Sequence, residues 1–390
     1  MVSLLLAIIY IAFISLGLPD SLLGSSWPIM QEQLGVPLSY AGIITMTIAA
    51  CTIVSSLFAD RVIRKLGTGL VTAISVALTA AGLMGFSFAT EFWMLCVLAI
   101  PYGLGAGAID AALNNYVALH YSSRHMSWLH AFWGVGVTIS PYIMSFCLTR
   151  NLGWEMGYRS VSFIQIALTA VLFATLPLWK RAAKTADHTE EEITPSVLTV
   201  PQALKLKGAP NVLIAFFCYC ALESTAGLWA TSYLVGHRSV DAQTAASFAA
   251  LFYLGITVGR ILNGFIADKF GDRTMIRTGI LVMAVGIILV ALPLPTTLPC
   301  LIGLVIIGLG CAPVYPCVIH STPVNFGKEN SQSLVGIQMA SAYTGSTLMP
   351  PLFGVIAQYV DIGLYPLYLG IFALVMLLMT EALNRKITFA

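Results

Sequence analysis

The sequence predicts an all-α membrane protein with twelve transmembrane helices, arranged as two pseudo-symmetric six-helix bundles. Of the 390 residues, 58% are hydrophobic and only 9% are charged, whereas soluble domains carry roughly 25% charged residues. Apolar runs of about 20 residues, each long enough to cross a hydrocarbon layer of roughly 30 Å, recur along the whole chain. These runs do not alternate with period two, which argues against a transmembrane barrel.

The predicted spans follow one another with mostly short loops between them. They cover residues 4–30, 39–59, 68–90, 92–119, 126–149, 158–180, 209–235, 242–267, 275–295, 297–320, 331–359 and 362–383. The chain's start, MVSLLLAIIYIAF, lacks a basic region and a small-residue cleavage site, so it predicts a first span and not a removable signal peptide. The polar segment 184–208 predicts a linker between an N-terminal bundle (1–183) and a C-terminal bundle (209–390).

The placement of lysine and arginine predicts the orientation. With the N-terminus inside, most of these residues fall in cytoplasmic segments, whereas the outer loops hold only Arg150, Arg159 and Arg238. We therefore expect a multi-pass plasma (inner) membrane protein with both termini and the linker in the cytoplasm. The net charge of +2 says little about partners, but the chain has no basic cluster of the kind that binds nucleic acid, so nucleic acid is not an expected partner. The eight cysteines follow neither a zinc spacing nor a disulfide framework, so no metal or cofactor is expected.

The two halves of the chain repeat each other. The loop after the second span reads SLFADRVIRK (56–65), and the loop after the eighth reads GFIADKFGDR (264–273). The first span carries Asp20 in DSLLGSSW, and the seventh carries Glu223 in ESTAGLW. Parallel repeats of this kind place a substrate site near the middle of the membrane, where the halves meet.

Twelve spans, a central polar loop and the repeated loop motif resemble the major facilitator superfamily. The second copy of the motif fits well, and the first has Ser56 and Ile63 where glycines are usual. The resemblance implies a transporter that works by alternating access, with a gating motif that links helix ends at the cytoplasmic face. The residues of this predicted motif are Asp60, Arg61, Arg64, Asp268, Lys269 and Arg273. The cations among them also fit a plain positive-inside role.

The segment GLGAGAIDAALNNYVALH (103–120) resembles the fucose permease group of sugar–proton symporters. In that group a glycine-rich stretch leads to an intramembrane acid followed by asparagine; here these are Asp110, Asn114 and Asn115. Asp20 also matches the group's pattern. The resemblance implies symport of a sugar with protons, and the two asparagines become substrate-site candidates. The glycines themselves are best explained by close helix contacts.

Asp110 is the candidate proton carrier. A carboxylate in hydrocarbon costs from about 2.5 kcal/mol upward, so it usually has a function. Asn114 lies one helical turn away on the same face. Asp110 could instead form a structural pair with Arg260, or bind Na⁺. Arg260 lies within a span, and Asp110 is its expected partner; the alternative is that its side chain reaches the membrane surface.

Asp20 and Glu223 occupy related places in the two halves, so we expect them to face a central cavity and bind the solute. Carboxylates accept hydrogen bonds from sugar hydroxyls and also bind cations, while a role in helix packing is the alternative. Trp27 and Trp229 follow these acids and could stack on a sugar ring. Either tryptophan could instead mark the membrane interface.

Three further polar side chains complete the predicted substrate site: His130, Tyr315 and Gln338. His130 could titrate near neutral pH or simply bond a backbone carbonyl. The favoured function is proton-coupled symport of a small polar solute, a sugar, by a monomer. Alternatives are a drug or metabolite exporter, Na⁺-coupled sugar symport and a non-transporting sensor. The chain has no HExxH or GxSxG motif, so an enzyme is not expected.

Overall fold

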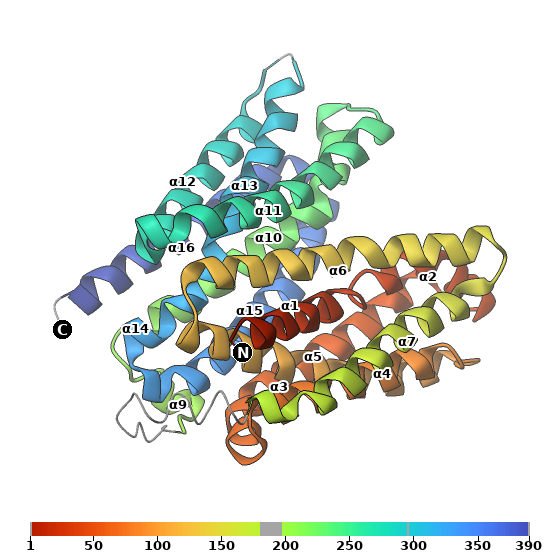
Figure 1. Ribbon diagram of the computed structural model, residues 1–390. Helices are drawn as coiled ribbons and strands as arrows, with labels where there is room; N and C mark the ends of the chain where they lie inside the picture. Colours follow the sequence, from red (N-terminus) through yellow and green to blue (C-terminus); the bar gives the residue numbers. More distant parts are fainter. Residues whose placement is uncertain (1, 180–196, 295, 389–390) are drawn as a thin grey trace. The chain divides into compact units, whose positions relative to one another are not determined.

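The computed structural model describes residues 2–179, 197–294 and 296–388, and within these ranges the chain is helical, with no β-strand (Figure 1). Among the described residues, eleven helical runs are long and apolar enough to cross a membrane. The last run, Lys328–Ile387, contains two helices, α15 (Lys328–Ile356) and α16 (Tyr365–Thr388), joined by the short helical turns η2 (Ala357–Asp361) and η3 (Ile362–Leu364). The predicted all-α membrane fold is thereby confirmed.

The remaining helices follow the predicted order along the chain. They are α1 (Val2–Gly17), α2 (Leu22–Gln33), η1 (Leu38–Tyr40), α3 (Ala41–Leu66), α4 (Thr68–Phe86), α5 (Phe92–His120), α6 (Ser123–Thr149), α7 (Gly153–Ala174), α9 (Val200–Ala203), α10 (Ala209–Arg238), α11 (Ala242–Phe270), α12 (Asp272–Ala291), α13 (Leu298–His320) and α14 (Thr322–Phe326).

Backbone contacts divide the chain into two compact units. The first contains Met1–Tyr116, Leu129–Val197 and Lys328–Ala340, and the second contains Val117–Trp128, Leu198–Gly327 and Ser341–Ala390. The end of α5 and the start of α6 thus belong to the second unit, while the start of α15 belongs to the first. Residues 184–196 of the predicted linker lie outside the described residues.

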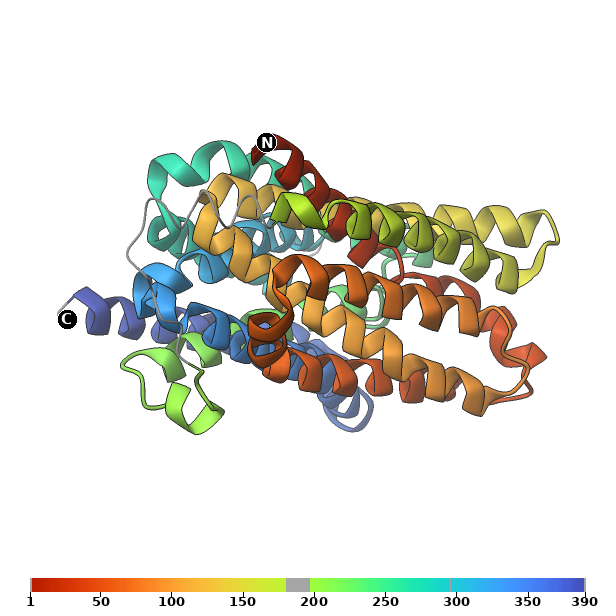
Figure 2. The ribbon, with the colours of Figure 1, turned by 60° about the horizontal axis from the view of Figure 1, so that its bottom comes forward.

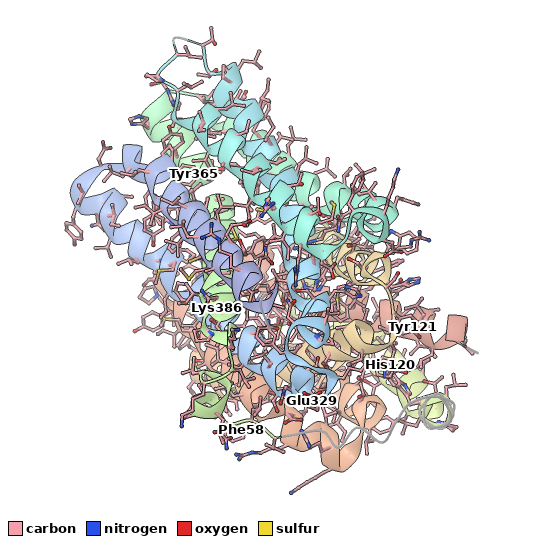
Figure 3. All side chains as sticks on the ribbon, turned by 90° about the vertical axis from the view of Figure 1, so that its left-hand side faces the viewer. Phe58, His120, Tyr121, Glu329, Tyr365 and Lys386 are labelled. Atoms are coloured by element: carbon pink, nitrogen blue, oxygen red, sulfur yellow. The ribbon has the colours of Figure 1, made fainter. Side chains whose placement is uncertain are left out.

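Helix pairs hold each unit together. In the first unit α4 packs against α7, where the Ser162 hydroxyl donates to the Ala80 carbonyl, and α3 lies beside α4 (Figure 2). In the second unit α13 packs against α11 and α12, and α10 packs against α16. Tyr365, at the start of α16, donates to the Ala226 carbonyl, and Lys386, near its end, donates to Asn211 (Figure 3). Helix α16 is therefore fixed to α10 near both ends.

Gly103 and Gly107 bring α5 against α3. A Cβ atom added at Gly107 would lie 2.3 Å from the Thr52 carbonyl oxygen, and one at Gly103 would lie 2.4 Å from the Ile48 carbonyl oxygen. The Thr52 hydroxyl also donates to the Gly103 carbonyl across the same contact. The predicted helix-contact role of these glycines is what the packing requires, because any side chain would separate the two backbones.

We predict that Gly107→Ala destabilises the protein by about 1–3 kcal/mol, the usual cost of overpacking. Thermal unfolding of the purified protein, followed by tryptophan fluorescence, measures the effect. Gly42→Ala is the matched control, since it lies in α3 and a Cβ atom there meets nothing within 4 Å. Equal melting temperatures for the two variants would contradict the close contact.

Candidate functional site

Asp20 lies at a break in the first predicted span. The sequence predicts one continuous helix over 4–30, but α1 ends at Gly17 and α2 begins at Leu22. Pro19 has no N–H to donate to the Ser15 carbonyl, four residues earlier. The Gln165 side-chain amide donates to that carbonyl instead, at 2.6 Å. The Ser15 carbonyl therefore keeps a hydrogen-bond donor despite the break. Asp20 lies in the turn between the two helices.

Two aromatic side chains hold the Asp20 carboxylate. The Tyr102 hydroxyl of α5 donates to Oδ1 at 3.1 Å, and the Trp133 indole Nε1 of α6 donates to Oδ2 at 3.0 Å. Asp20 itself remains exposed. A carboxylate can accept about four hydrogen bonds, so this one keeps capacity for further donors.

Asp110, Asn114 and His130 form a buried polar chain in the first unit. The Asn114 Nδ2 donates to the Asp110 Oδ1 at 2.7 Å and to the Asp110 backbone carbonyl at 2.9 Å. The His130 Nε2 lies 3.0 Å from the Asn114 Oδ1. The exposed fractions of the three residues are 4%, 0% and 5%. The predicted pairing of Asp110 with Asn114 on one helix face is present, and α6 adds an imidazole to it.

Asn115 binds the start of α15. Its Nδ2 donates to the Gln332 Oε1 at 2.7 Å, and its Oδ1 accepts from the Ser331 hydroxyl at 2.5 Å. Its amide thus bonds on both sides to the segment 328–340, which belongs to the same unit. Among the predicted substrate residues, Asn115 consequently occupies a helix contact. Gln338, also in this segment, is fully buried.

The first copy of the loop motif also binds α15. Asp60 is buried and accepts from the Ser333 hydroxyl. Arg64 forms an ion pair with Asp60 at 2.8 Å across one helical turn. The Arg61 guanidinium lies over the Phe58 ring, 5.5 Å from its centroid, at the exposed surface of α3 (Figure 3). Asp60 therefore fastens α3 to α15, while Arg61 does not take part in that contact.

Glu223, Arg260 and Tyr315 form a cluster of polar side chains in the second unit. The Arg260 Nη2 lies 3.6 Å from the Glu223 Oε1, and the Arg260 side chain is almost fully buried. The same guanidinium lies over the Tyr315 ring, 6.0 Å from its centroid. Three predicted site residues are thus brought together. The Asp110–Arg260 pair expected from the sequence would join residues of different units and stays a prediction.

The two predicted ring-stacking tryptophans both pack within their own units. Trp27 is buried and meets the Phe92 ring edge-on. Trp229 donates from its indole to the Pro350 carbonyl at 2.9 Å and packs against Phe353. Trp229 is only half-buried, whereas Trp27 has little surface left for a solute.

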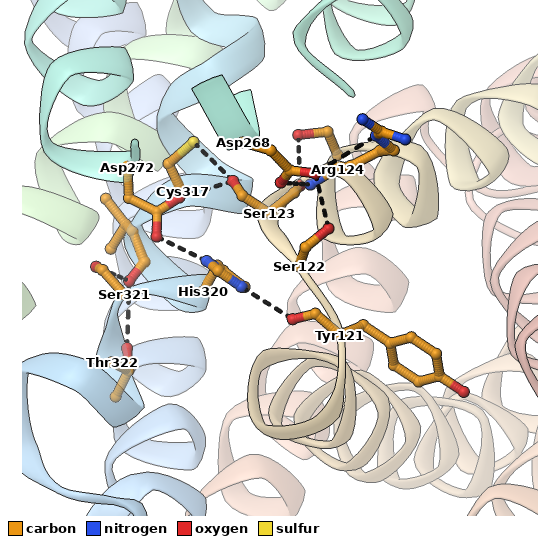
Figure 4. A network of polar contacts seen from close by, with 12 residues as sticks. Tyr121, Ser122, Ser123, Arg124, Asp268, Asp272, Cys317, His320, Ser321 and Thr322 are labelled. Atoms are coloured by element: carbon orange, nitrogen blue, oxygen red, sulfur yellow. Dashed lines mark hydrogen bonds and ion pairs between the residues drawn. The ribbon is translucent and has the colours of Figure 1, made fainter. Parts of the chain in front are cut away.

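The second copy of the loop motif binds the start of α6. Asp268 accepts from the Arg124 backbone N–H at 3.1 Å and from the Ser122 hydroxyl at 3.0 Å (Figure 4). The Arg124 side chain adds an ion pair at 3.4 Å. Carboxylates are stabilised at helix N-termini, where backbone N–H groups lack internal partners. Asp268 thus caps α6 from the end of α11.

His320 bridges α12 and the turn before α6. Its Nδ1 lies 2.6 Å from the Asp272 Oδ2, and its Nε2 lies 3.0 Å from the Tyr121 carbonyl oxygen (Figure 4). Both ring nitrogens face acceptors, and only the protonated ring donates from both. Asp272 also accepts from the Ser123 hydroxyl at 2.7 Å. The segment 117–128 is therefore held at four consecutive residues, 121–124.

The remaining cations of the second motif copy point elsewhere. Lys269 lies over the Phe270 ring, 5.6 Å from its centroid. Arg273 lines a pocket with Arg277 and Glu381, which form an ion pair with each other. Arg273 therefore lies beside the Arg277–Glu381 ion pair.

Several residues of these clusters were not among the site residues predicted from the sequence. Tyr102 and Trp133 each place a hydrogen-bond donor inside a predicted span, which was a usable signal for a buried acceptor nearby. The polar run Ser331–Gln332–Ser333 at the start of a span was another. Nothing local pointed to His320, because its partners come from other helices.

The family follows from a match over nearly the whole chain. The model of the Major Facilitator Superfamily matches residues 9–246 and 212–384. The chain belongs to the major facilitator superfamily. It is thus a multi-pass membrane protein, and the resemblance inferred from the loop motifs is confirmed. Its family and fold are those of transporters and not of enzymes.

Individual relatives are distant. "Bypass of stop codon protein 6" of Saccharomyces cerevisiae is 22% identical over 283 residues, which cover 67% of this chain and 57% of that protein. The glucose/mannose transporter GlcP of Bacillus subtilis is 20% identical over 264 residues, covering 67% and 65%. The chain thus spans less than two thirds of the length of these relatives.

The fold has a close structural counterpart. The crystal structure of the E. coli fucose:proton symporter FucP superposes with a TM-score of 0.76, covering 97% of this chain and 98% of that one at 16% identity. This likeness establishes the fold of the chain.

We predict that Arg260→Met destabilises the protein and that the double change Arg260→Met with Glu223→Gln recovers most of the loss. Removing one partner of a buried ion pair costs about 3–5 kcal/mol, because the other charge is left uncompensated. Thermal unfolding in detergent measures both variants. Arg150→Met, at an exposed site, is the control for loss of an arginine. A double variant less stable than Arg260→Met alone would contradict the pairing.

Proposed function

We propose that this protein imports a small polar solute, a sugar, together with protons across the inner membrane. The observation that carries the proposal is the burial of Asp110 inside a membrane helix, with its carboxylate hydrogen-bonded to Asn114. Burial disfavours the charged carboxylate relative to the neutral carboxylic acid. A buried carboxyl group therefore takes up or releases a proton when its hydration changes. Alternating access supplies that change of hydration. The structural likeness to a fucose:proton symporter supports the same mechanism.

Asp20 is the proposed solute-binding acid of the first unit. The Asp20 residue is exposed, and Tyr102 and Trp133 hold its carboxylate in position. Sugar hydroxyls donate well to a fixed carboxylate, and the flat face of an indole suits the C–H surface of a sugar ring. Glu223 takes the related place in the second unit, where Arg260 and Tyr315 accompany it. The similarity of the chain to a glucose/mannose transporter supports a sugar as the solute.

The two loop motifs are the proposed gate at the cytoplasmic ends of the helices. Asp60 binds Ser333 at the start of α15, and Asp268 binds the start of α6. Both contacts join a motif acid to a segment that the other half of the chain supplies. Opening toward the cytoplasm would break these contacts. The positive-inside distribution of lysine and arginine supports the proposal that both termini lie in the cytoplasm.

We predict that Asp110→Asn abolishes uphill accumulation but keeps counterflow exchange. The amide cannot carry a proton, so the solute still crosses while its movement is no longer driven by the proton gradient. Proteoliposomes loaded with candidate sugars such as L-fucose, D-glucose and D-xylose measure both activities. Unchanged accumulation in Asp110→Asn would refute the coupling role.

The matched control is Asp241→Asn. Asp241 caps α11, where its side chain accepts from the Thr244 N–H, and it lies at an exposed position. It should leave the ratio of accumulation to exchange as in the unaltered protein. In intact cells, solute addition should make the outer medium more alkaline; acidification would instead indicate export in exchange for protons.

We predict that Asp20→Asn weakens sugar binding roughly 10- to 100-fold, because hydrogen bonds to a charged group contribute about 1.5–3 kcal/mol. A ligand that binds the folded state raises its melting temperature, so a thermal-shift titration measures the affinity. Trp133→Phe, which removes only one donor to Asp20, should cost less. Equal affinity in Asp20→Asn and the unaltered protein would remove Asp20 from the binding site.

A further inference from the structure

His130 contacts the proposed coupling site from a second helix. It lies in α6, is 5% exposed, and places its Nε2 3.0 Å from the Asn114 Oδ1. On its other side the Phe13 ring of α1 meets the imidazole edge-on, with ring centroids 5.4 Å apart. The nearly buried imidazole therefore packs against α1 through Phe13 and makes a polar contact with α5 through Asn114.

The orientation of the Asn114 amide follows from its other contacts. The Nδ2 group donates twice to Asp110, once to Oδ1 and once to the backbone carbonyl. Both of these are acceptors, so the amide nitrogen must face them. The Asn114 oxygen is then the atom that faces His130, and an amide oxygen only accepts hydrogen bonds. It follows that the His130 Nε2 carries a proton and donates.

We infer that His130 is a positioning residue that sets the proton affinity of Asp110 by holding the Asn114 amide in this orientation. With the N–H groups on Asp110, Asn114 stabilises the carboxylate. With the amide turned over, its oxygen would face Asp110 and would stabilise the protonated acid instead. Turning the Asn114 amide over removes its hydrogen bond with His130 and brings the Asn114 Nδ2 group against the His130 Nε2–H. His130 therefore disfavours the turned-over amide.

Other titratable groups of the first unit lie near this chain. Asp20, in the turn between α1 and α2, interacts electrostatically with Asp110. The Tyr102 hydroxyl of α5 donates to the Asp20 carboxylate. Trp133, three residues after His130 on α6, donates to Asp20 as well. Trp133 thus donates directly to Asp20, while His130 is linked to Asp110 through Asn114. One short stretch of α6 is therefore connected to both acids.

The inference rests on the proposed coupling role of Asp110, and it predicts a change that loss of packing alone would not produce. Without the imidazole N–H, the amide of Asn114 turns more easily, and the protonated form of Asp110 gains a partner. The protonation midpoint of Asp110 should rise by about one pH unit in His130→Leu, as expected when a hydrogen bond to the charged form is lost. His130→Gln keeps a side-chain N–H donor and should restore the original midpoint.

Infrared difference spectroscopy of the purified protein in lipid, stepped through pH without any solute, tests this. The carboxyl C=O band that disappears in Asp110→Asn reports the protonation of Asp110. His125→Leu is the matched control, since it removes a histidine from the same helix away from Asn114. The expected result is a higher midpoint in His130→Leu, with His130→Gln and His125→Leu close to the unaltered protein.

Two outcomes would overturn the inference while leaving Asp110 as the coupling acid: an unchanged midpoint in His130→Leu, or equal shifts in His130→Leu and His130→Gln. The second would mean that the ring matters and its N–H donor does not. A spectrum in which no band depends on Asp110 at any accessible pH would overturn the proposed coupling role, and the positioning role of His130 with it.

Discussion

A polar group inside a membrane helix that water does not reach needs a partner within the chain, and the rest of this structure depends on how that requirement is met. Pro19 interrupts the first span, and the interruption is tolerated because the amide of Gln165 takes the Ser15 carbonyl. The Ser15 hydroxyl in turn donates to the same side chain at 2.6 Å. One glutamine from α7 therefore makes possible the turn that presents Asp20.

The same requirement separates the acids by their surroundings. Asp20 is held by two aromatic donors and stays exposed, which suits a group that meets a solute. Asp110 is buried against an amide, which suits a group that must change its charge only when the surroundings change. Glu223 shares a site with the buried Arg260, so its charge is balanced within its own unit. Three acids that look alike in the sequence thus have three environments.

The exchange of segments between the two units is the second organising feature. Residues 117–128 join the second unit, and residues 328–340 join the first. Each exchanged segment is fastened by the acid of a repeated loop motif, Asp268 in one case and Asp60 in the other. The repeat seen in the sequence is therefore also a repeat of contacts. It gives both motif acids the same task, although only one of the two copies keeps the usual glycines.

The sequence by itself determined the membrane class, the order of the helices, the superfamily and the adjacency of Asp110 with Asn114. These depend on apolar length and helical spacing, which act over a few residues. Only the tertiary structure decided that Tyr102 and Trp133 hold Asp20, that Asn115 binds Gln332, and that Arg260 meets Glu223 in its own unit. These partners lie on different helices, and hydropathy does not encode which faces of apolar helices meet, because lipid and neighbouring helix are equally apolar.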